Sequence, residues 1–231
     1  MKLFFWKQKT LQTFPILKMF PKFASSIMDD KAKEILNQAA ILFSKFGVKS
    51  MTMDDIARQL GISKKTLYQY VDNKRDLVRK SIEIHIDQEE CVMKDQLNVE
   101  GNAIDELMAM TRLVGSQMKE MHPSVIFDLK KYHPDAHRCL VDHRDQFIYS
   151  NIKKNLESGV ESGLYRNNIN PEILTKLYLS MINVILDPQH NSLSDYSAAE
   201  VYTEMIRYHV RGIASAKGRD YLKQKFKQEN V

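Results

Sequence analysis

Cysteine, glycine, proline and tryptophan are scarce in this chain. Its 231 residues include two Cys, eight Gly, six Pro and one Trp. Cys91 and Cys139 fit no metal-binding or disulfide spacing, so we expect buried or idle thiols in a reducing cytoplasm. With 43% hydrophobic residues and twelve Met, this composition favours a helical globular protein that buries a real core.

Long apolar runs and catalytic motifs are also missing. No apolar run approaches the ~20 residues of a membrane span, so no membrane partner is expected. The chain has no G-x-S-x-G, no phosphate-cradling glycine loop, no H-E-x-x-H and no Cys–His pairing. We therefore expect no enzyme, no catalytic residue and no cofactor. Glu89 and Glu90 are interpreted as solvated charges on a helix face.

A metal site is the remaining chemical alternative, because the chain has seven His. His133 and His137 are four residues apart, but Pro134 begins a helix between them, so they need not share a face. His143 could converge with them in principle. Solvated loop histidines explain the cluster equally well, and no metal is expected.

The net charge of +5 is divided unevenly along the chain. Residues 1–80 carry sixteen Lys and Arg against seven Asp and Glu, whereas residues 81–216 carry thirteen against twenty. Residues 217–231 are basic again, with five against two. A basic segment suits phosphate neutralisation, and the acidic part should not bind DNA.

The basic segment contains the pattern TMDDIARQLGISKKTLYQYVDNK at residues 52–74. Thr52 with Asp55 three residues later forms a capping box, so a helix is expected to begin at Met53. Gly61 ends this helix where a left-handed residue is needed. Ser63 can cap the next helix, which would bury two apolar positions and expose lysines, tyrosines and an amide. This pattern predicts a helix-turn-helix.

Residues 35–77 resemble the DNA-binding domain of the tetracycline-repressor (TetR) family of bacterial regulators. The resemblance rests on Phe43 and Phe46–Gly47 at the end of a first helix, on T-x-x-D-I-A, and on G-I-S-K-K-T-L-Y-Q-Y-V-x-N-K. It covers about fifty residues at tight spacing and is more specific than a bare helix-turn-helix pattern. It implies an all-α chain with an N-terminal three-helix DNA-binding domain and a C-terminal helical domain for ligand binding and dimerisation.

The DNA-contacting residues are predicted from exposure and from this resemblance. They are Thr52, Ser63, Lys64, Lys65, Thr66, Tyr68, Gln69, Tyr70 and Lys74. Gln69 is the best candidate for base readout, because its amide can pair bidentately with adenine. The three lysines are expected to hold phosphate. Either tyrosine could instead pack inside the motif, but they are two residues apart, so only one need be buried.

The predicted organisation has four parts. Residues 1–28 are an N-terminal extension, read as a disordered tail or an upstream start preceding Met28, with a basic membrane-surface or minor-groove arm as the alternative. Residues 29–76 form the DNA-binding domain, 77–216 the regulatory domain, and 217–231 a basic tail that can fray. About nine helices are expected. Two late apolar helices, 171–185 and 198–214, predict a homodimer joined by a four-helix bundle.

A Met-rich helix over residues 103–121 has two readings. Its methionines can fill the core, or they can line a ligand cavity, where thioethers adapt to differently shaped apolar partners. The candidate pocket residues are Met110, Met118, Phe127, Tyr132, Phe147 and Tyr178.

The sequence thus predicts a cytoplasmic, dimeric regulator that binds a palindromic operator and is released from it by a small molecule of unknown identity. Most members of the family are repressors. Three alternatives stay open: a transcriptional activator on the same scaffold, a helical carrier with a vestigial DNA-binding domain, and a membrane-surface protein that uses residues 1–27 and 217–231.

Overall fold

The computed structural model of the chain describes residues 29–97, 101–186, 193 and 195–229. The predicted extension over residues 1–28, with its alternative readings, lies outside this part. The predicted all-α fold is confirmed: within the described ranges the regular elements are helices, and the one β-type pairing is the bridge between Tyr165 and Ala214. Among these residues no helix is long and apolar enough to span a bilayer.

The helices follow one another closely along the chain. They are α2 (Asp30–Phe46), α3 (Met53–Gln59), α4 (Lys64–Leu67), α5 (Lys74–Leu97), α6 (Ala103–Glu120), α7 (Val125–Tyr132), α8 (Pro134–His143), the π-helical segment η3 (Arg144–Ile148), α9 (Tyr149–Glu161), α10 (Pro171–Leu186), α11 (Ala198–Ile213) and α12 (Ala216–Glu229). The expected count of about nine was low for two reasons. The helix expected over 134–159 is divided by η3, and the basic C-terminal segment is helical.

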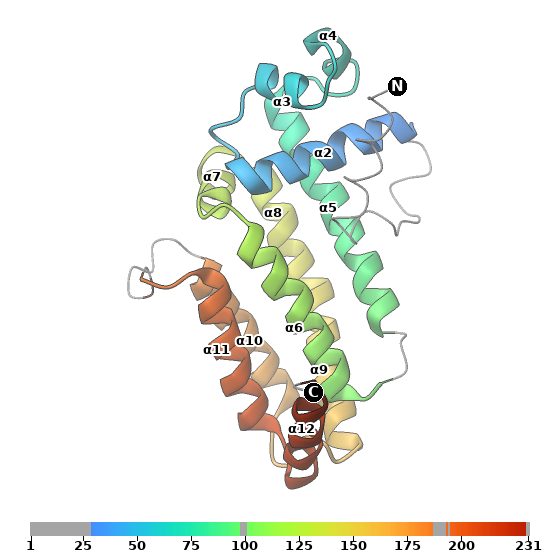
Figure 1. The fold of residues 1–231 in the computed structure, drawn as a ribbon, viewed down its shortest axis with the longest axis vertical. Coiled ribbons are helices and arrows are strands. Elements are labelled where there is room, and N and C mark those ends of the chain that lie inside the picture. The colour runs from blue at the N-terminus through green and yellow to red at the C-terminus, as the bar shows by residue number, and fades with distance from the viewer. Residues whose placement is uncertain (1–28, 98–100, 187–192, 194, 230–231) are drawn as a thin grey trace.

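Two hydrophobic clusters lie at opposite ends of an elongated molecule (Figure 1). The first cluster joins α2, α3, α4 and the start of α5 to Val125, Leu129 and Ala136 of α7 and α8. The second joins α6, α9, α10, α11 and α12. α5 runs from the first cluster along the side of the second, so the expected domain boundary between residues 76 and 77 falls inside one continuous helix.

Several helices begin at the polar caps that their sequences provide. Asp29 accepts the backbone N–H of Lys31 at the start of α2, and reciprocal capping boxes begin α6 at Asn102 and α11 at Ser197. Pro134 occupies the first turn of α8, as expected. Gly47 ends α2 with φ +83°, a backbone conformation that favours glycine.

The C-terminal helix α12 packs onto the second cluster, so the expectation of a fraying tail was wrong for its described part. The Tyr221 hydroxyl donates to Asp105 Oδ2 at 2.7 Å, and Lys225 forms an ion pair with the same carboxylate. Gly218 lies so close to the carbonyl of Leu164 that a Cβ there would stand 2.1 Å from its oxygen. Leu222 is buried beside them. The close approach at Gly218 and the two contacts of Asp105 thus hold the basic helix α12 against the rest of the protein.

Candidate functional site

The helix-turn-helix forms as its local sequence predicts. Thr52 Oγ1 accepts the Asp55 N–H at 3.1 Å and Asp55 Oδ2 accepts the Thr52 N–H at 3.1 Å, which completes the capping box. The Thr52 hydroxyl and backbone lower the pKa of Asp55. At the other end, Gly61 has φ +67° and the Ile62 N–H donates to the Ala57 carbonyl at 3.0 Å. This six-residue closure is a Schellman motif, which turns the chain toward α4.

The second helix of the motif, α4, is a single turn followed by tighter turns. Ser63 Oγ caps it by accepting the Thr66 N–H at 3.0 Å. The Gln69 N–H donates to the Thr66 carbonyl, three residues back, so the last turn is of the 3₁₀ kind. Leu67 and Val71 are buried, as the sequence predicted. The opposite side of this segment therefore faces outward.

The outward side carries the side chains expected to read DNA. Lys65 and Gln69 are exposed, and Tyr68 is 44% exposed. Lys64 is exposed too, but its Nζ donates to Asp54 Oδ2 of α3 at 2.8 Å, and this carboxylate raises the pKa of Lys64. An ion pair between exposed partners is weak and exchangeable, so Lys64 stays available to phosphate.

The structure separates the two tyrosines, as a spacing of two residues allows. Tyr70 is half-buried and packs against the first hydrophobic cluster, whereas Tyr68 projects outward. Thr66 is also half-buried, with its hydroxyl 2.8 Å from Ser63 Oγ. Tyr70 and Thr66 therefore support the motif, and direct contact of either with DNA stays a prediction.

Lys74 is less exposed than a phosphate-binding lysine is expected to be. Its Nζ donates to the carbonyl of Lys49 at 3.3 Å. Burial lowers the pKa of Lys74, against the opposing attraction of Asp128. The side chain thus joins the start of α5 to the turn between α2 and α3, and its phosphate contact stays a prediction.

A cavity of about 750 Å³ lies between the two hydrophobic clusters. Its wall comes from α2, α5, α6, α7, α8, η3, α9 and α10 and is mostly apolar. Three of the predicted pocket residues, Met110, Met118 and Tyr178, line it. The same Met-rich helix also supplies buried residues to the second cluster, so its methionines fill the core and line the cavity, and ligand binding there stays a prediction.

The other three predicted pocket residues lie outside the cavity wall. On α7 the inward face is fixed by Val125 and Leu129, one turn apart, which turns Phe127 outward. Tyr132 is the last residue of α7 and is 39% exposed. Lys131 Nζ stands over both rings, at 5.2 and 5.4 Å from their centroids. The prediction that these two rings line the cavity was wrong.

Phe147 is the third displaced residue. Its ring stacks on His143 with centroids 5.3 Å apart, and Lys94 Nζ lies 5.2 Å from its centroid. It lines a separate pocket of about 260 Å³ beside α5. Phe147 belongs to the π-helical segment, which sets the orientation of its ring. No local sequence pattern predicts this segment.

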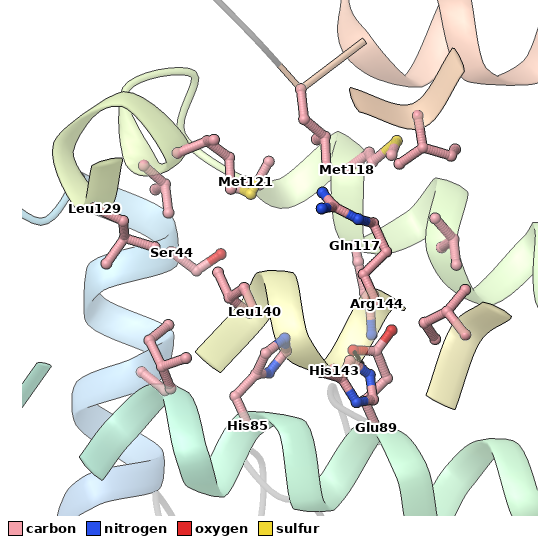
Figure 2. A pocket seen from close by; sticks show the side chains of 18 of the residues that line it. Ser44, His85, Glu89, Gln117, Met118, Met121, Leu129, Leu140, His143 and Arg144 are labelled. Carbon is pink, nitrogen blue, oxygen red and sulfur yellow. Dashed lines mark ion pairs between the residues drawn. The ribbon is translucent and has the colours of Figure 1, made fainter. Parts of the chain in front are cut away.

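The sequence reading missed the polar end of the cavity. His85 and Glu89, one turn apart on α5, point into it, together with His143 of α8 (Figure 2). The Glu89 side chain is 15% exposed, so the interpretation of Glu89 as a solvated charge was wrong. Burial opposes its ionisation, yet the His143 imidazole and His85 hold the pKa of Glu89 below its usual value. The i, i+4 spacing of His85 and Glu89 was the available signal.

Arg144 opens the π-helical segment and also lines the cavity. Its Nε donates to Asp145 Oδ1 at 3.1 Å, and its terminal nitrogen donates to Asn183 of α10. π-Helical turns inside α-helices occur frequently at functional sites. Here the wider turn lies where α8 and α9 meet the polar end of the cavity.

The histidines do not converge as the metal alternative required. His133 is buried at the junction of α7 and α8, while His137 and His143 line the cavity. Within the described ranges no group of three His, Cys, Asp or Glu side chains could hold a metal ion.

Helix α7 joins the cavity to the helix-turn-helix. Val125 and Leu129 form part of the cavity wall, whereas the buried Asp128 of the same helix is not part of it. Asp128 Oδ2 accepts the Lys49 N–H at 2.8 Å and the Ser124 hydroxyl at 3.1 Å. One short helix therefore contacts both the space inside the protein and the turn that precedes α3.

Comparison with known proteins agrees with this geometry. The sequence model described as "Bacterial regulatory proteins, tetR family" matches residues 35–80. The helix-turn-helix transcriptional regulator YvaF of Bacillus subtilis is 29% identical over 186 residues, which cover 79% of this chain and 95% of that protein. The negative regulator IcaR of Staphylococcus epidermidis is 43% identical over 56 residues, 24% of this chain and 29% of IcaR.

Solved structures show the same fold. A TetR-family regulator from Agrobacterium tumefaciens superposes with a TM-score of 0.65 at 16% identity, over 80% of this chain and 98% of its own. The KstR2 regulator of Mycobacterium tuberculosis gives a TM-score of 0.51 at 18% identity, over 84% of this chain and 100% of its own. Both likenesses extend well beyond the matched DNA-binding segment, so they include the helical C-terminal part.

Proposed function

Because this chain belongs to the TetR family of bacterial helix-turn-helix transcriptional regulators, we propose that it is a ligand-released repressor. It is a DNA-binding regulator, and in this proposal a homodimer binds a palindromic operator and leaves it when a small molecule fills the cavity. Repression is the proposed direction because IcaR, a relative in the DNA-binding segment, is described as a negative regulator. Activation from the same scaffold is the alternative, since the sign depends on where the operator lies.

The observation that carries this proposal is the double role of α7. Its inner face lines the cavity through Val125 and Leu129, and Asp128 of the same helix holds the turn between α2 and α3. A ligand that displaces α7 therefore moves a support of the DNA-reading segment. The ligand can shift DNA affinity only by its own differential affinity for the two conformations.

Dimer formation is supported by an apolar surface on α10. Ile173 and Leu177, four residues apart, are 55% and 52% exposed, and Val184 continues the same helix at 37%. Tyr208 on the neighbouring α11 is 75% exposed. α10 and α11 pack side by side along one side of the molecule, away from α5 (Figure 1). Packing this pair against its symmetry mate forms a four-helix bundle and covers these side chains.

The proposed mechanism follows from the geometry of the DNA duplex. Two recognition segments must sit about 34–36 Å apart to enter successive major grooves. α5 connects the first hydrophobic cluster to the rest of each subunit, so its tilt sets that separation. Ligand binding in the cavity favours a tilt that no longer fits the operator.

An anisotropy titration tests the DNA-reading half of this proposal. The full chain is titrated against labelled DNA from its own upstream region and against scrambled DNA, at two salt concentrations. Preference for the upstream DNA, weakened by salt and lost in a Tyr68→Ala/Gln69→Ala variant, is expected. Equal weak binding to both DNAs would contradict it and would favour a carrier with a vestigial DNA-binding domain.

A further inference from the structure

Two acidic side chains, Glu89 and Glu120, line the mostly apolar cavity, and of the two only Glu89 is shielded from solvent. Glu89 lies on the α5 wall, and its side chain retains 15% of its exposure (Figure 2). Four methionines, Met93, Met110, Met118 and Met121, contribute to the rest of the lining. A carboxylate in such surroundings is costly unless a cation or several donors compensate it.

The compensation that the protein itself gives Glu89 is incomplete. His143 Nε2 lies 3.5 Å from the Glu89 carboxylate, which is too long for a good hydrogen bond. The other ring nitrogen of His143 lies 3.4 Å from Glu90, and both ring nitrogens are buried without a hydrogen-bond partner among the described residues. One imidazole thus stands between two carboxylates. Lys94 compensates Glu90, at 3.0 Å, and not Glu89.

Arg144 and His85 also lie at this end of the cavity (Figure 2). Arg144 is held by Asp145 and Asn183. His85 lies one turn before Glu89 and acts on it electrostatically. Glu89 can therefore accept a donor from a molecule inside the cavity.

We propose that the effector is a lipophilic amine, with an apolar body among the methionines and one protonated nitrogen that donates to Glu89. This inference rests on the proposed function, because it names the ligand of the same cavity. A charge-assisted hydrogen bond from an ammonium group is stronger than one from a neutral donor. An anionic head group would meet Glu89 with like charge. Thioether side chains adapt to apolar bodies of different shape.

Three head groups on one alkyl chain test this proposal. Decylamine, decanol and decanoate displace the apolar fluorophore N-phenyl-1-naphthylamine from the full-length protein at neutral pH, and each dissociation constant is measured. Decylamine is expected to bind about tenfold or more tightly than decanol, with decanoate weakest. The order of the three dissociation constants tests the proposal in the wild-type protein, without any substitution.

Two variants assign the preference to a residue. Glu89→Gln removes the charge at nearly constant shape and is expected to abolish the preference for decylamine over decanol. Glu120→Gln is the matched control, because Glu120 also lines the cavity but is exposed at its rim. It should keep the full preference. Thermal melting by circular dichroism checks that both variants are folded.

Equal binding of the three compounds, tighter binding of decanoate, or an unchanged preference in Glu89→Gln would each overturn this inference. The same compounds are added to the protein–DNA complex to separate the two proposals. DNA release without head-group preference removes the amine assignment alone. Cavity binding that leaves DNA affinity unchanged removes the proposed ligand-released mechanism, whatever the preference.

Discussion

The carboxylate of Asp128 accepts the backbone N–H of Lys49 at 2.8 Å, although the two residues are 79 positions apart in the chain. Lys49 belongs to the turn between α2 and α3, and Asp128 belongs to the helix that lines the cavity. Lys74 donates to the carbonyl of the same Lys49. The turn is therefore held from the regulatory side through its N–H and from α5 through its carbonyl.

Replacing Asp128 by Ala leaves the Lys49 N–H without its acceptor. We expect a loss of about 1–3 kcal/mol in the free energy of unfolding, measured by chemical denaturation. The change in DNA affinity caused by an effector should also shrink, because α7 no longer holds the turn. Asp128→Asn keeps an acceptor and should restore most of both quantities.

The control for this prediction is Asp220→Ala. Asp220 is an exposed acid on α12 that forms an ion pair with the exposed Lys223. Its removal should change stability by less than about 0.5 kcal/mol. A similar effect of the two substitutions would show that the Asp128 contact has no special role.

Substitutions of Gln69 and Lys65 are expected to change DNA binding in different ways. Gln69→Ala should cost about 1–3 kcal/mol of binding to the operator and reduce discrimination against scrambled DNA. Lys65→Ala should weaken binding to both DNAs alike and lower the slope of log affinity against log salt by about one. Anisotropy titrations over a salt series measure both. Loss of discrimination in Lys65→Ala would reverse the two assigned roles.

Leu177→Arg should separate the two subunits. Leu177 is half-exposed on the apolar surface of α10, and an arginine there would be buried without a partner in the proposed four-helix bundle. Light scattering after size exclusion should give the mass of a monomer, and operator binding should weaken. Lys154→Glu, an exposed site on α9, serves as the control and should stay dimeric. A dimeric Leu177→Arg would place the interface elsewhere.

Gly159 and Gly115 form a matched pair of helical glycines that face tyrosine rings. A Cβ at Gly159 would stand 2.0 Å from the ring of the buried Tyr165, whereas a Cβ at Gly115 would meet Tyr202 at 3.8 Å, an ordinary contact. Gly159→Ala should lose about 1–3 kcal/mol of stability or more. Gly115→Ala should gain about 0.5–1 kcal/mol. Thermal and chemical denaturation test both, and equal effects would contradict the predicted close packing.

His209 makes stability depend on pH in the acidic range. Burial lowers the pKa of His209 from 6.5 to about 4, next to the ring of Tyr178. Between these pH values the unfolded state binds more protons, so stability falls as the pH is lowered from 6.5 towards 4. The full loss is about 3 kcal/mol.

The variant His209→Gln isolates this contribution, because every other titrating group is shared with the wild-type protein. The gap between the two stability curves should change across this window and stay constant above it. Parallel curves from pH 7 down to 4 would exclude the assigned role of His209.

The helix-turn-helix was predictable almost residue by residue because its determinants are local. Thr52, Asp55 and Gly61 satisfy backbone groups within a few positions of themselves, so their spacing alone fixes where α3 begins and ends. The burial of Leu67 follows from the same short-range geometry.

The cavity was predictable only in part because its lining depends on how helices rotate against each other. Glu89 and Glu90 are adjacent in the sequence. Glu89 lines the cavity, whereas Glu90 forms an ion pair with Lys94. Phe127 and Leu129 lie two residues apart on α7, and only their positions around the helix axis decide that Leu129 lines the cavity and Phe127 does not. The docking of α12 depends on Asp105, more than a hundred residues earlier. Such long-range contacts leave no local pattern.

The wide turn Arg144–Ile148 has a consequence for how this protein can evolve. A π-helical turn holds one more residue than an α-helical turn needs, so a single inserted or deleted codon in this stretch can convert one into the other. Such a change would rotate His143 and Phe147 relative to each other. Descendants of this gene could thereby acquire a different chemical preference in the cavity in one mutational step and keep the same DNA-reading surface.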